Sequence, residues 1–167
     1  MKNFQYLLIL STFLAMNSCM DKTKEDLPTE EIVATTLIEI MDKGLAIKES
    51  SLGFQETIDT LTARIEGKGL RVFATINHHQ NAEKNGFELA PTTLIIFGNP
   101  NVGAPLMQMN QSIGIDLPMK MLVTEKDGKV FMTFNEPSYL KTRHDLPDES
   151  DKILAKVSRM LNGLTNL

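Results

Sequence analysis

Two stretches of the chain carry the hydrophobic spacing of amphipathic helices. The first covers residues 52–66, where apolar residues recur every three or four positions. Its apolar stripe consists of Phe54, Ile58, Leu61 and Ile65. The second covers residues 150–162, with an apolar face made of Ile153, Leu154, Val157, Met160, Leu161 and Leu164. Glycine commonly ends a helix, and the glycines at 67, 69 and 163 are placed to end these two.

Shorter segments between these helices have the composition of β-strands. The strands that we predict are residues 45–48, 70–76, 92–97, 119–125 and 130–135. Residues 70–76 alternate, which is typical of a strand with one face on a core. The continuous apolar run Leu94–Phe97 predicts a buried strand. Asp127-Gly128 supplies the positive φ values of a tight hairpin turn between the last two strands.

The order of these elements predicts an α+β domain. One antiparallel-rich sheet is expected, with both long helices packed on one of its faces. The turn-rich segment 98–103 separates the third strand from a short helical insertion, which we predict over residues 105–111. A further short helix is predicted over residues 29–42, where Thr29 is placed to cap it and acidic residues follow.

The N-terminus has the pattern of an export signal. Lys2 supplies a positive start, residues 4–16 are mostly apolar, and Asn17 and Ser18 then lead to Cys19. The apolar run is too short for a membrane-spanning helix, which needs about 20 residues. A cysteine at this point resembles the lipidation site of bacterial lipoproteins, and the alternative is an ordinary cleaved signal with an unrelated thiol. We expect a signal peptide over 1–18, then a lipidated tether over 19–43.

Composition excludes several classes of function. The formal net charge is −4, and the basic residues are scattered, which disfavours nucleic-acid binding. The chain has a single cysteine, so if lipid occupies Cys19 then no thiol is left for a disulfide, a zinc site or a nucleophile. We expect no cofactor. The expected location is the bacterial cell envelope, on its periplasmic or surface side, with the lipid as membrane contact.

The segment after the third strand has the two-glycine spacing of a phosphate-binding loop, at Gly98 and Gly103. It lacks the Lys-Ser/Thr pair that contacts phosphates and magnesium, and its prolines lack backbone donors, so nucleotide binding is disfavoured. Two interpretations remain open. The segment is either a rigid connection or a helix N-terminus that accepts a small anion beside Asn99.

The histidines are the side chains that titrate nearest to neutral pH. His78 and His79 are adjacent at the end of a predicted strand, where their side chains would point to opposite faces. A site built from His78, His144 and a carboxylate such as Glu88 or Glu136 would suit acid–base or metal chemistry. The alternative, which we favour, is that each histidine hydrogen-bonds a loop backbone and fixes its shape.

Two Met-x-Met pairs invite a copper interpretation, because exported thioethers bind Cu(I). The pairs are Met107 with Met109 and Met119 with Met121. Met119 and Met121 would share one face of a strand, whereas Met107 and Met109 would diverge on a helix. Methionine is also a common filler of cores, and we favour core packing for all four. No metal site is expected.

Several stretches from residue 76 onward read together as a family signature. They are Ile76-Asn77-His78, Phe97-Gly98-Asn99-Pro100, Leu117-Pro118, Asp127-Gly128-Lys129-Val130, Phe134-Asn135-Glu136-Pro137 and Arg143-His144. This set resembles the domain of unknown function 302 family, over roughly residues 44–164. We therefore assign residues 44–167 to one domain of this kind. Family members commonly carry Asp where this chain has Asn77.

The resemblance implies a β-α-β4-α fold similar to that of the TATA-binding protein, and it implies a homodimer. It implies no established activity. Two classes of function stay open: a non-catalytic domain that binds or senses a small ligand, and a small metal-dependent or acid–base enzyme using His78 and His144. The candidate ligand-binding residues are His78, Gly98, Asn99, Gly103, Asn135 and His144.

Overall fold

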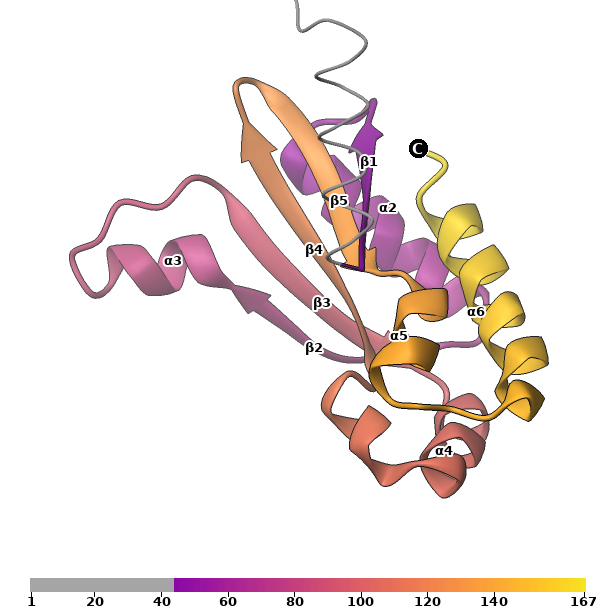
Figure 1. Cartoon of the computed structure of the whole chain (residues 1–167). Helices are drawn as coiled ribbons and strands as arrows, with labels where there is room; N and C mark the ends of the chain where they lie inside the picture. Colours follow the sequence, from indigo (N-terminus) through magenta and orange to yellow (C-terminus); the bar gives the residue numbers. More distant parts are fainter. Residues whose placement is uncertain (1–43) are drawn as a thin grey trace, which may run out of the picture.

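The computed structural model describes residues 44–167 and contains one five-stranded antiparallel sheet with the order β1-β5-β4-β3-β2. The strands are β1 (Leu45–Ser50), β2 (Arg71–Asn77), β3 (Thr92–Gly98), β4 (Met119–Lys126) and β5 (Lys129–Asn135). Two long helices, α2 (Phe54–Gly67) and α6 (Asp151–Leu164), pack on one face of the sheet (Figure 1). The predicted α+β architecture is confirmed. The predicted signal peptide, lipidated Cys19, tether and helix over 29–42 lie outside the described residues.

The core lies between the sheet and the two long helices. Alternate residues of the three central strands point into it, as the twofold repeat of a strand requires. On β3 these are Thr93, Ile95 and Phe97. The prediction that this strand is buried throughout was wrong, because Leu94 and Ile96 are only half-buried on the face that the helices do not cover. An antiparallel sheet commonly has one such open face.

Strand β2 forms an edge of the sheet, and fewer of its side chains are buried than its alternating sequence pattern predicted. Its pairing with β3 is interrupted between Val72 and Ala74, where the register shifts by one residue. Ala74 is exposed, so the prediction of one continuous face on the core was wrong. At the bulge, the guanidinium of Arg71 lies 5.1 Å from the centre of the Phe73 ring. Bulges of this kind are common at sheet edges.

The turn between β4 and β5 has the predicted chemistry. Asp127 and Gly128 have φ values of 53° and 73°, as a tight hairpin requires. The helix over 54–67 ends as predicted, and Gly69 follows with a φ of 70°. Gly163 does not end α6, which continues to Leu164. A glycine inside a helix costs only about 1 kcal/mol relative to alanine, so it does not by itself stop one.

The short helices differ most from the predictions. The insertion α4 (Pro100–Met109) begins five residues before the predicted start, within the segment that we interpreted as a turn. Asn99 caps it, since its side-chain oxygen accepts from the N–H of Asn101, and Pro100 occupies the first turn, where no backbone donor is needed. Pro105 lies inside this helix rather than at its start. A short 3-10 helix, η1 (Gln111–Ile115), follows.

Two further short helices were not predicted. They are α3 (His78–Glu83), on an arm beyond the end of β2, and α5 (Pro137–Arg143), directly after β5. The histidines at 78 and 79 therefore begin a helix rather than extend a strand. Asn77 is the cap of α3, because its side-chain oxygen accepts from the N–H of Gln80 at 2.8 Å. The Asp that the family commonly carries here would cap a helix equally well.

The described chain enters the sheet beside α5. The carbonyl of Gly44 accepts a hydrogen bond from the N–H of Glu136 at 2.9 Å, and Leu45 pairs with Asn135. Gly44 has a φ of 69°, and a β-carbon at this position would overlap atoms of the Tyr139 ring. Only glycine fits this junction without strain.

Lys141 ties α5 to the start of α6. Its Nζ lies 2.7 Å from Oδ1 of Asp148 and 2.6 Å from Oδ1 of Asp151. These hydrogen bonds, the one to Asp148 first, raise the pKa of the lysine above its ordinary value, and the lysine in turn lowers the pKa of Asp148. All three groups reach solvent, so the contacts orient the two helices rather than dominate stability.

The methionines at 119 and 121 lie in the core, as we favoured, while those at 107 and 109 are half-buried and pack against it. Within residues 44–167, no helix is both long and apolar enough to cross a membrane.

Candidate functional site

A network of polar side chains surrounds His144, at the end of α5. The ring Nε2 lies 2.6 Å from Oδ2 of Asp116, and the ring Nδ1 lies 2.8 Å from the hydroxyl of Ser112. Both the imidazole and the carboxylate are nearly closed to solvent, with 5% and 10% of their side chains exposed. Ser112 lies on the exposed side of the network. The order of contacts is therefore hydroxyl, imidazole, carboxylate.

Asp116 is held by three donors, which come from the end of α5 and the end of β5. Besides His144, the amide of Asn135 at the end of β5 donates to its Oδ1 at 3.2 Å. The Nε of Arg143 lies 3.5 Å from its Oδ2. An ionised carboxylate accepts hydrogen bonds only, so donors on both oxygens suit the charged form. These contacts fix the carboxylate between η1, α5 and the sheet.

The serine side of the network is held by Asn110. Its side-chain nitrogen donates to the backbone carbonyl of His144 at 2.7 Å, and its side-chain oxygen accepts from the N–H of Ser112 at 3.0 Å. One amide thus joins the start of η1 to the end of α5. Because both ends are bound, Ser112 and His144 keep their relative position.

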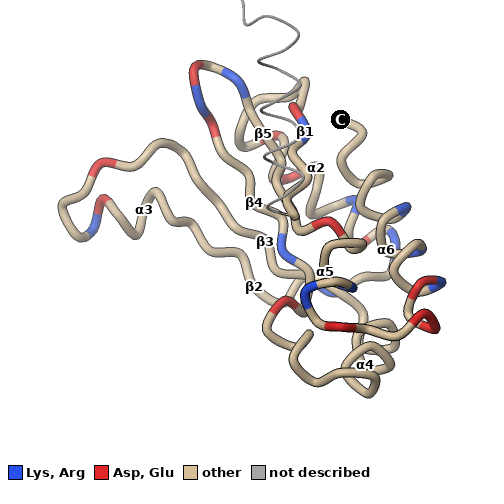
Figure 2. The backbone as a smooth tube through the Cα atoms, in the orientation of Figure 1, with Lys and Arg blue, Asp and Glu red and all other residues tan. Residues whose placement is uncertain are grey.

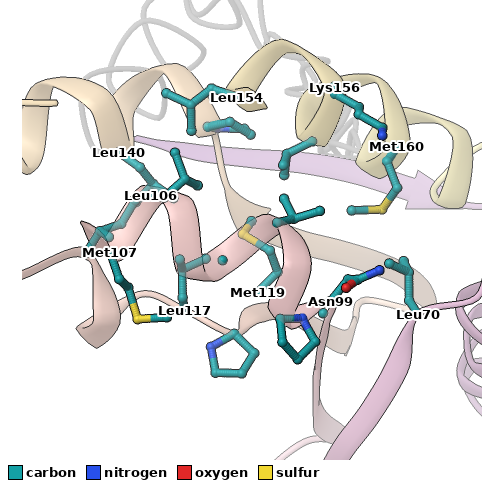
Figure 3. A pocket seen from close by; sticks show the side chains of 18 of the residues that line it. Leu70, Asn99, Leu106, Met107, Leu117, Met119, Leu140, Leu154, Lys156 and Met160 are labelled. Carbon is teal, nitrogen blue, oxygen red and sulfur yellow. The ribbon is translucent and has the colours of Figure 1, made fainter. Parts of the chain in front are cut away.

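An apolar pocket of about 450 Å³ lies next to this network. Side chains of α6, including Leu154, Lys156 and Met160, approach it from one side (Figure 3). From the other side come residues of α4 and its cap, of the segments before β2 and β4, and of the start of β4, labelled as Leu106, Met107, Asn99, Leu70, Leu117 and Met119. The volume lies in the range of small-molecule sites.

The charges around this pocket are all positive. Its lining contains Lys68 and Lys156 and no acidic residue, and neither lysine forms an ion pair within residues 44–167. The segment from Thr92 to Ile115, which supplies α4, has no charged side chain at all, and Figure 2 shows that helix without a blue or red segment. The pocket is therefore an apolar space with a basic rim.

The structure divides the predicted site residues into three places. Gly98, Asn99 and Gly103 line the pocket, while Asn135 and His144 belong to the network around Asp116. A site joining a histidine to a carboxylate was the interpretation that we did not favour, and the carboxylate that His144 contacts is neither Glu88 nor Glu136. Glu136 instead accepts from the hydroxyl of Ser158.

His78 lies apart from both places. It follows Asn77, which pairs with Thr93 at the start of β3, whereas the network adjoins the other end of that strand, where Phe97 pairs with Met119. Five residues of extended strand separate Thr93 from Gly98, which is roughly 17 Å. The structure does not bring His78 and His144 together, because they are at opposite ends of the sheet (Figure 1). Among residues 44–167, no group of three metal-ligating side chains is present.

The interpretation that we favoured, in which a histidine hydrogen-bonds a loop backbone, holds for His79. Its ring bonds the backbone carbonyl of Leu89 and so fixes the arm that follows α3. His144 differs, because its ring contacts two side chains, Ser112 and Asp116. Only its backbone carbonyl bonds a residue of the loop before η1, where it accepts from Asn110. Sequence reasoning missed Asp116, Ser112 and both pocket lysines. The position of Asp116 directly before Leu117-Pro118, a pair in the family signature, was the available signal.

Comparison with known proteins identifies the family. The model of the "Domain of unknown function DUF302" matches residues 46–164, which is most of the chain. Both the pocket and the network lie within the matched range. The match thus covers every described element except the first residue of β1 and the extreme C-terminus.

The curated relatives are longer proteins. Over 113 residues, or 67% of this chain, it is 43% identical to proteins named "Fluoride-specific ion channel FluC 1" from Brucella suis and from Brucella abortus. The same identity holds for "Fluoride-specific ion channel FluC 2" of Brucella melitensis. The chain spans less than half the length of these relatives, 44% of the first and 42% of the others.

A solved structure has the same fold. It is the crystal structure of an uncharacterized conserved protein DUF302 from Bacillus stearothermophilus, with a TM-score of 0.67 over 74% of this chain and 96% of that one. The sequence identity is 20%, so the likeness concerns the fold alone. With a family model that matches most of its length and a solved neighbour of the same architecture, this chain belongs to the DUF302 family.

Proposed function

We propose that this domain binds a small amphipathic anion. The apolar part of the ligand lies in the pocket between α4 and α6, and its acidic group lies toward Lys68 and Lys156. The observation that carries this proposal is the chemistry of the lining, which is apolar except for two lysines and a few amide and backbone groups.

The pocket can bury a hydrocarbon chain, but it offers few hydrogen-bond partners to a polar group. Leu106, Ile113 and Leu140 form part of its floor and are almost fully closed to water. Each methylene that a ligand buries contributes about 0.8 kcal/mol. Part of that gain is offset by the lost freedom of the ligand, so a short chain without a charged group binds weakly.

The basic rim supplies the preference for an acid. Exposed ion pairs are worth about 0.2–1 kcal/mol each, so two lysines would favour a carboxylate over an alcohol by roughly two- to thirtyfold. Asn99, at the start of α4, places a further polar group at the pocket, where the positive end of the helix dipole also favours an anion. The ligand class follows from these contacts together.

The test is a thermal-unfolding screen of a soluble form covering Pro28–Leu167, with decanoate, decanol and acetate as probes. Decanoate at about 100 times its Kd should add about 2.7 kcal/mol to the free energy of unfolding. Decanol should bind more weakly because it lacks the charge, and acetate should have no effect because it lacks the chain. No stabilisation by decanoate at any soluble concentration would contradict the proposal.

Matched variants locate the binding site. The double variant Lys68→Gln/Lys156→Gln should lose the preference for decanoate over decanol, whereas Lys152→Gln, an exposed lysine on the same helix outside the pocket, should keep it. Val102→Phe should fill part of the pocket and weaken both probes. Unchanged affinities in the double variant and in Val102→Phe would place binding elsewhere.

The names of the Brucella relatives suggest one more probe for the screen. Those proteins are named as fluoride-specific channels, and this chain matches part of each. Sodium fluoride is therefore included, with sodium chloride at equal ionic strength as its control. Stabilisation by fluoride with no response to decanoate would replace the amphipathic ligand by a small inorganic anion.

We further propose that lipid on Cys19 holds this domain at the cell envelope. The supporting pattern is the apolar run of residues 4–16, followed after Asn17 and Ser18 by the chain's single cysteine. Labelled palmitate should be incorporated by the full chain and lost in Cys19→Ala. Incorporation that persists in Cys19→Ala would exclude this residue as the site. The homodimer implied by the family resemblance stays a prediction.

A further inference from the structure

We propose that Ser112 is a nucleophile that accepts acyl groups from esters, with His144 as its general base and Asp116 as the residue that positions the base. The contacts are a hydroxyl 2.8 Å from one ring nitrogen and a carboxylate 2.6 Å from the other. An activated serine needs a base within about 2.6–3.2 Å and a third group that orients the base. All three groups are present with those separations.

The direction of the two hydrogen bonds of the His144 ring follows from the charge of the Asp116 carboxylate. An ionised carboxylate has no proton to give, so Nε2 of His144 must donate to Asp116. A neutral imidazole that carries its proton on Nε2 has a lone pair on Nδ1. The hydroxyl of Ser112 then donates to Nδ1, which is the arrangement in which a base removes the serine proton. Compared with the familiar serine hydrolases, the two ring nitrogens exchange roles.

Burial is distributed as this chemistry needs. The base and the positioning carboxylate are nearly closed to solvent, while the serine lies at the surface, where an ester can approach. The amide of Asn110 holds both the backbone of Ser112 and that of His144, so the pair is preorganised. A network that served stability alone would not need its hydroxyl at the solvent side.

The reaction balances as an ester hydrolysis. The hydroxyl oxygen of Ser112 bonds to the carbonyl carbon of the ester, and its proton moves to Nδ1 of His144. The bond from that carbon to the leaving oxygen breaks, and the alcohol leaves with this proton. Water then attacks the acyl-serine and gives a proton to Nδ1. The acid departs, the serine oxygen takes the proton back, and ester plus water has become acid plus alcohol.

The choice of acyl group rests on the proposed function. Ile113, the residue after Ser112, lines the apolar pocket, as does Leu140 of α5. An ester with an apolar acyl chain could therefore place the chain in the pocket and the carbonyl near the serine. The experiment separates the two ideas, because a short acetyl ester tests the nucleophile and a decanoyl ester tests the pocket.

The measurement is acylation of the purified Pro28–Leu167 protein by p-nitrophenyl acetate, followed by peptide mass spectrometry. We expect an acetyl group on Ser112 and release of p-nitrophenolate. Ser112→Ala should abolish the adduct, and His144→Gln should slow its formation by at least about 100-fold, since a general base contributes 10²–10⁴. Asp116→Asn should slow it similarly, because an amide can donate to Nε2 and so favours a proton on Nδ1.

Controls separate chemistry from folding. Ser138→Ala removes an exposed serine on α5 outside the network and should leave acylation unchanged. Ser112→Ala should melt within a few degrees of the parent protein, because its hydroxyl is at the surface. An acetyl group found elsewhere, or equal acylation in Ser112→Ala, would overturn the proposal. If the acetyl ester acylates Ser112 and the decanoyl ester does not, Ser112 is still the nucleophile. That result would reject only the idea that the pocket binds the acyl chain.

Discussion

Phe97→Ala is expected to lower the free energy of unfolding by about 3–5 kcal/mol. Phe97 lies at the core end of β3, is fully buried, and pairs with Met119 on one side and Val72 on the other. Truncation removes the transfer energy of the ring and leaves a cavity that the surrounding strands cannot close. For a domain of this size the loss should lower the melting temperature by at least about 10 °C. Circular dichroism measures the free energy in a urea titration and the melting temperature in a thermal scan.

Phe87→Ala is the matched control, because it is the same substitution at a ring that is 70% exposed on the arm after α3. Surface substitutions away from special features usually change stability by less than about 0.5 kcal/mol. Equal losses in the two variants would mean that the core does not lie between the sheet and the long helices as described.

Gly44→Ala is the second substitution with a large expected effect, about 2–4 kcal/mol of destabilisation. Alanine at a φ of 69° is strained, and its β-carbon would overlap the Tyr139 ring. Overpacking of this kind typically costs 1–3 kcal/mol. The same unfolding experiment measures the loss, which should appear as a lower urea midpoint with an unchanged slope.

A double-mutant cycle distinguishes the two causes. In a Tyr139→Ala background the clash is absent and only the backbone strain is left, so Gly44→Ala should cost clearly less than in the parent protein. Gly128→Ala, at another positive φ but with open space around it, gives the cost of strain alone. If Gly44→Ala costs no more than Gly128→Ala, the contact with Tyr139 is not as described.

The long elements were predictable because their patterns are periodic over many residues. The stripes of α2 and α6, and the Asp127-Gly128 turn between two apolar strands, each allow one interpretation. The start of α4 was not predictable from periodicity. Its first turn carries asparagine, proline and glycine, which are typical of turns, and the helix depends on the cap at Asn99. The arm at α3 was missed because no apolar face marks it.

The sequence allowed some residues of the candidate site to be predicted, but not the contacts that bring them together. His144 and Asn135 stood out by residue type and by the family signature, yet the carboxylate that joins them, Asp116, is 19 residues from one and 28 from the other. Contacts between residues so far apart in sequence depend on how β4 and β5 align, and a local sequence pattern does not predict that alignment. The pocket lysines were missed because each looks like an ordinary surface charge until α2 and α6 lie side by side.

The junction at Gly44 has a consequence for the segment that precedes it. Gly44 bonds Glu136, whose neighbour Pro137 lines the pocket, so residues 1–43 join the domain at the pocket's end of the sheet. If the lipid proposed for Cys19 anchors the chain to a membrane surface, residues 20–43 would connect that surface to the pocket's end of the domain. For tethers of this kind the effective concentration is of the order of millimolar. A ligand carried on the same surface would then occupy the pocket even if its affinity in free solution were weak.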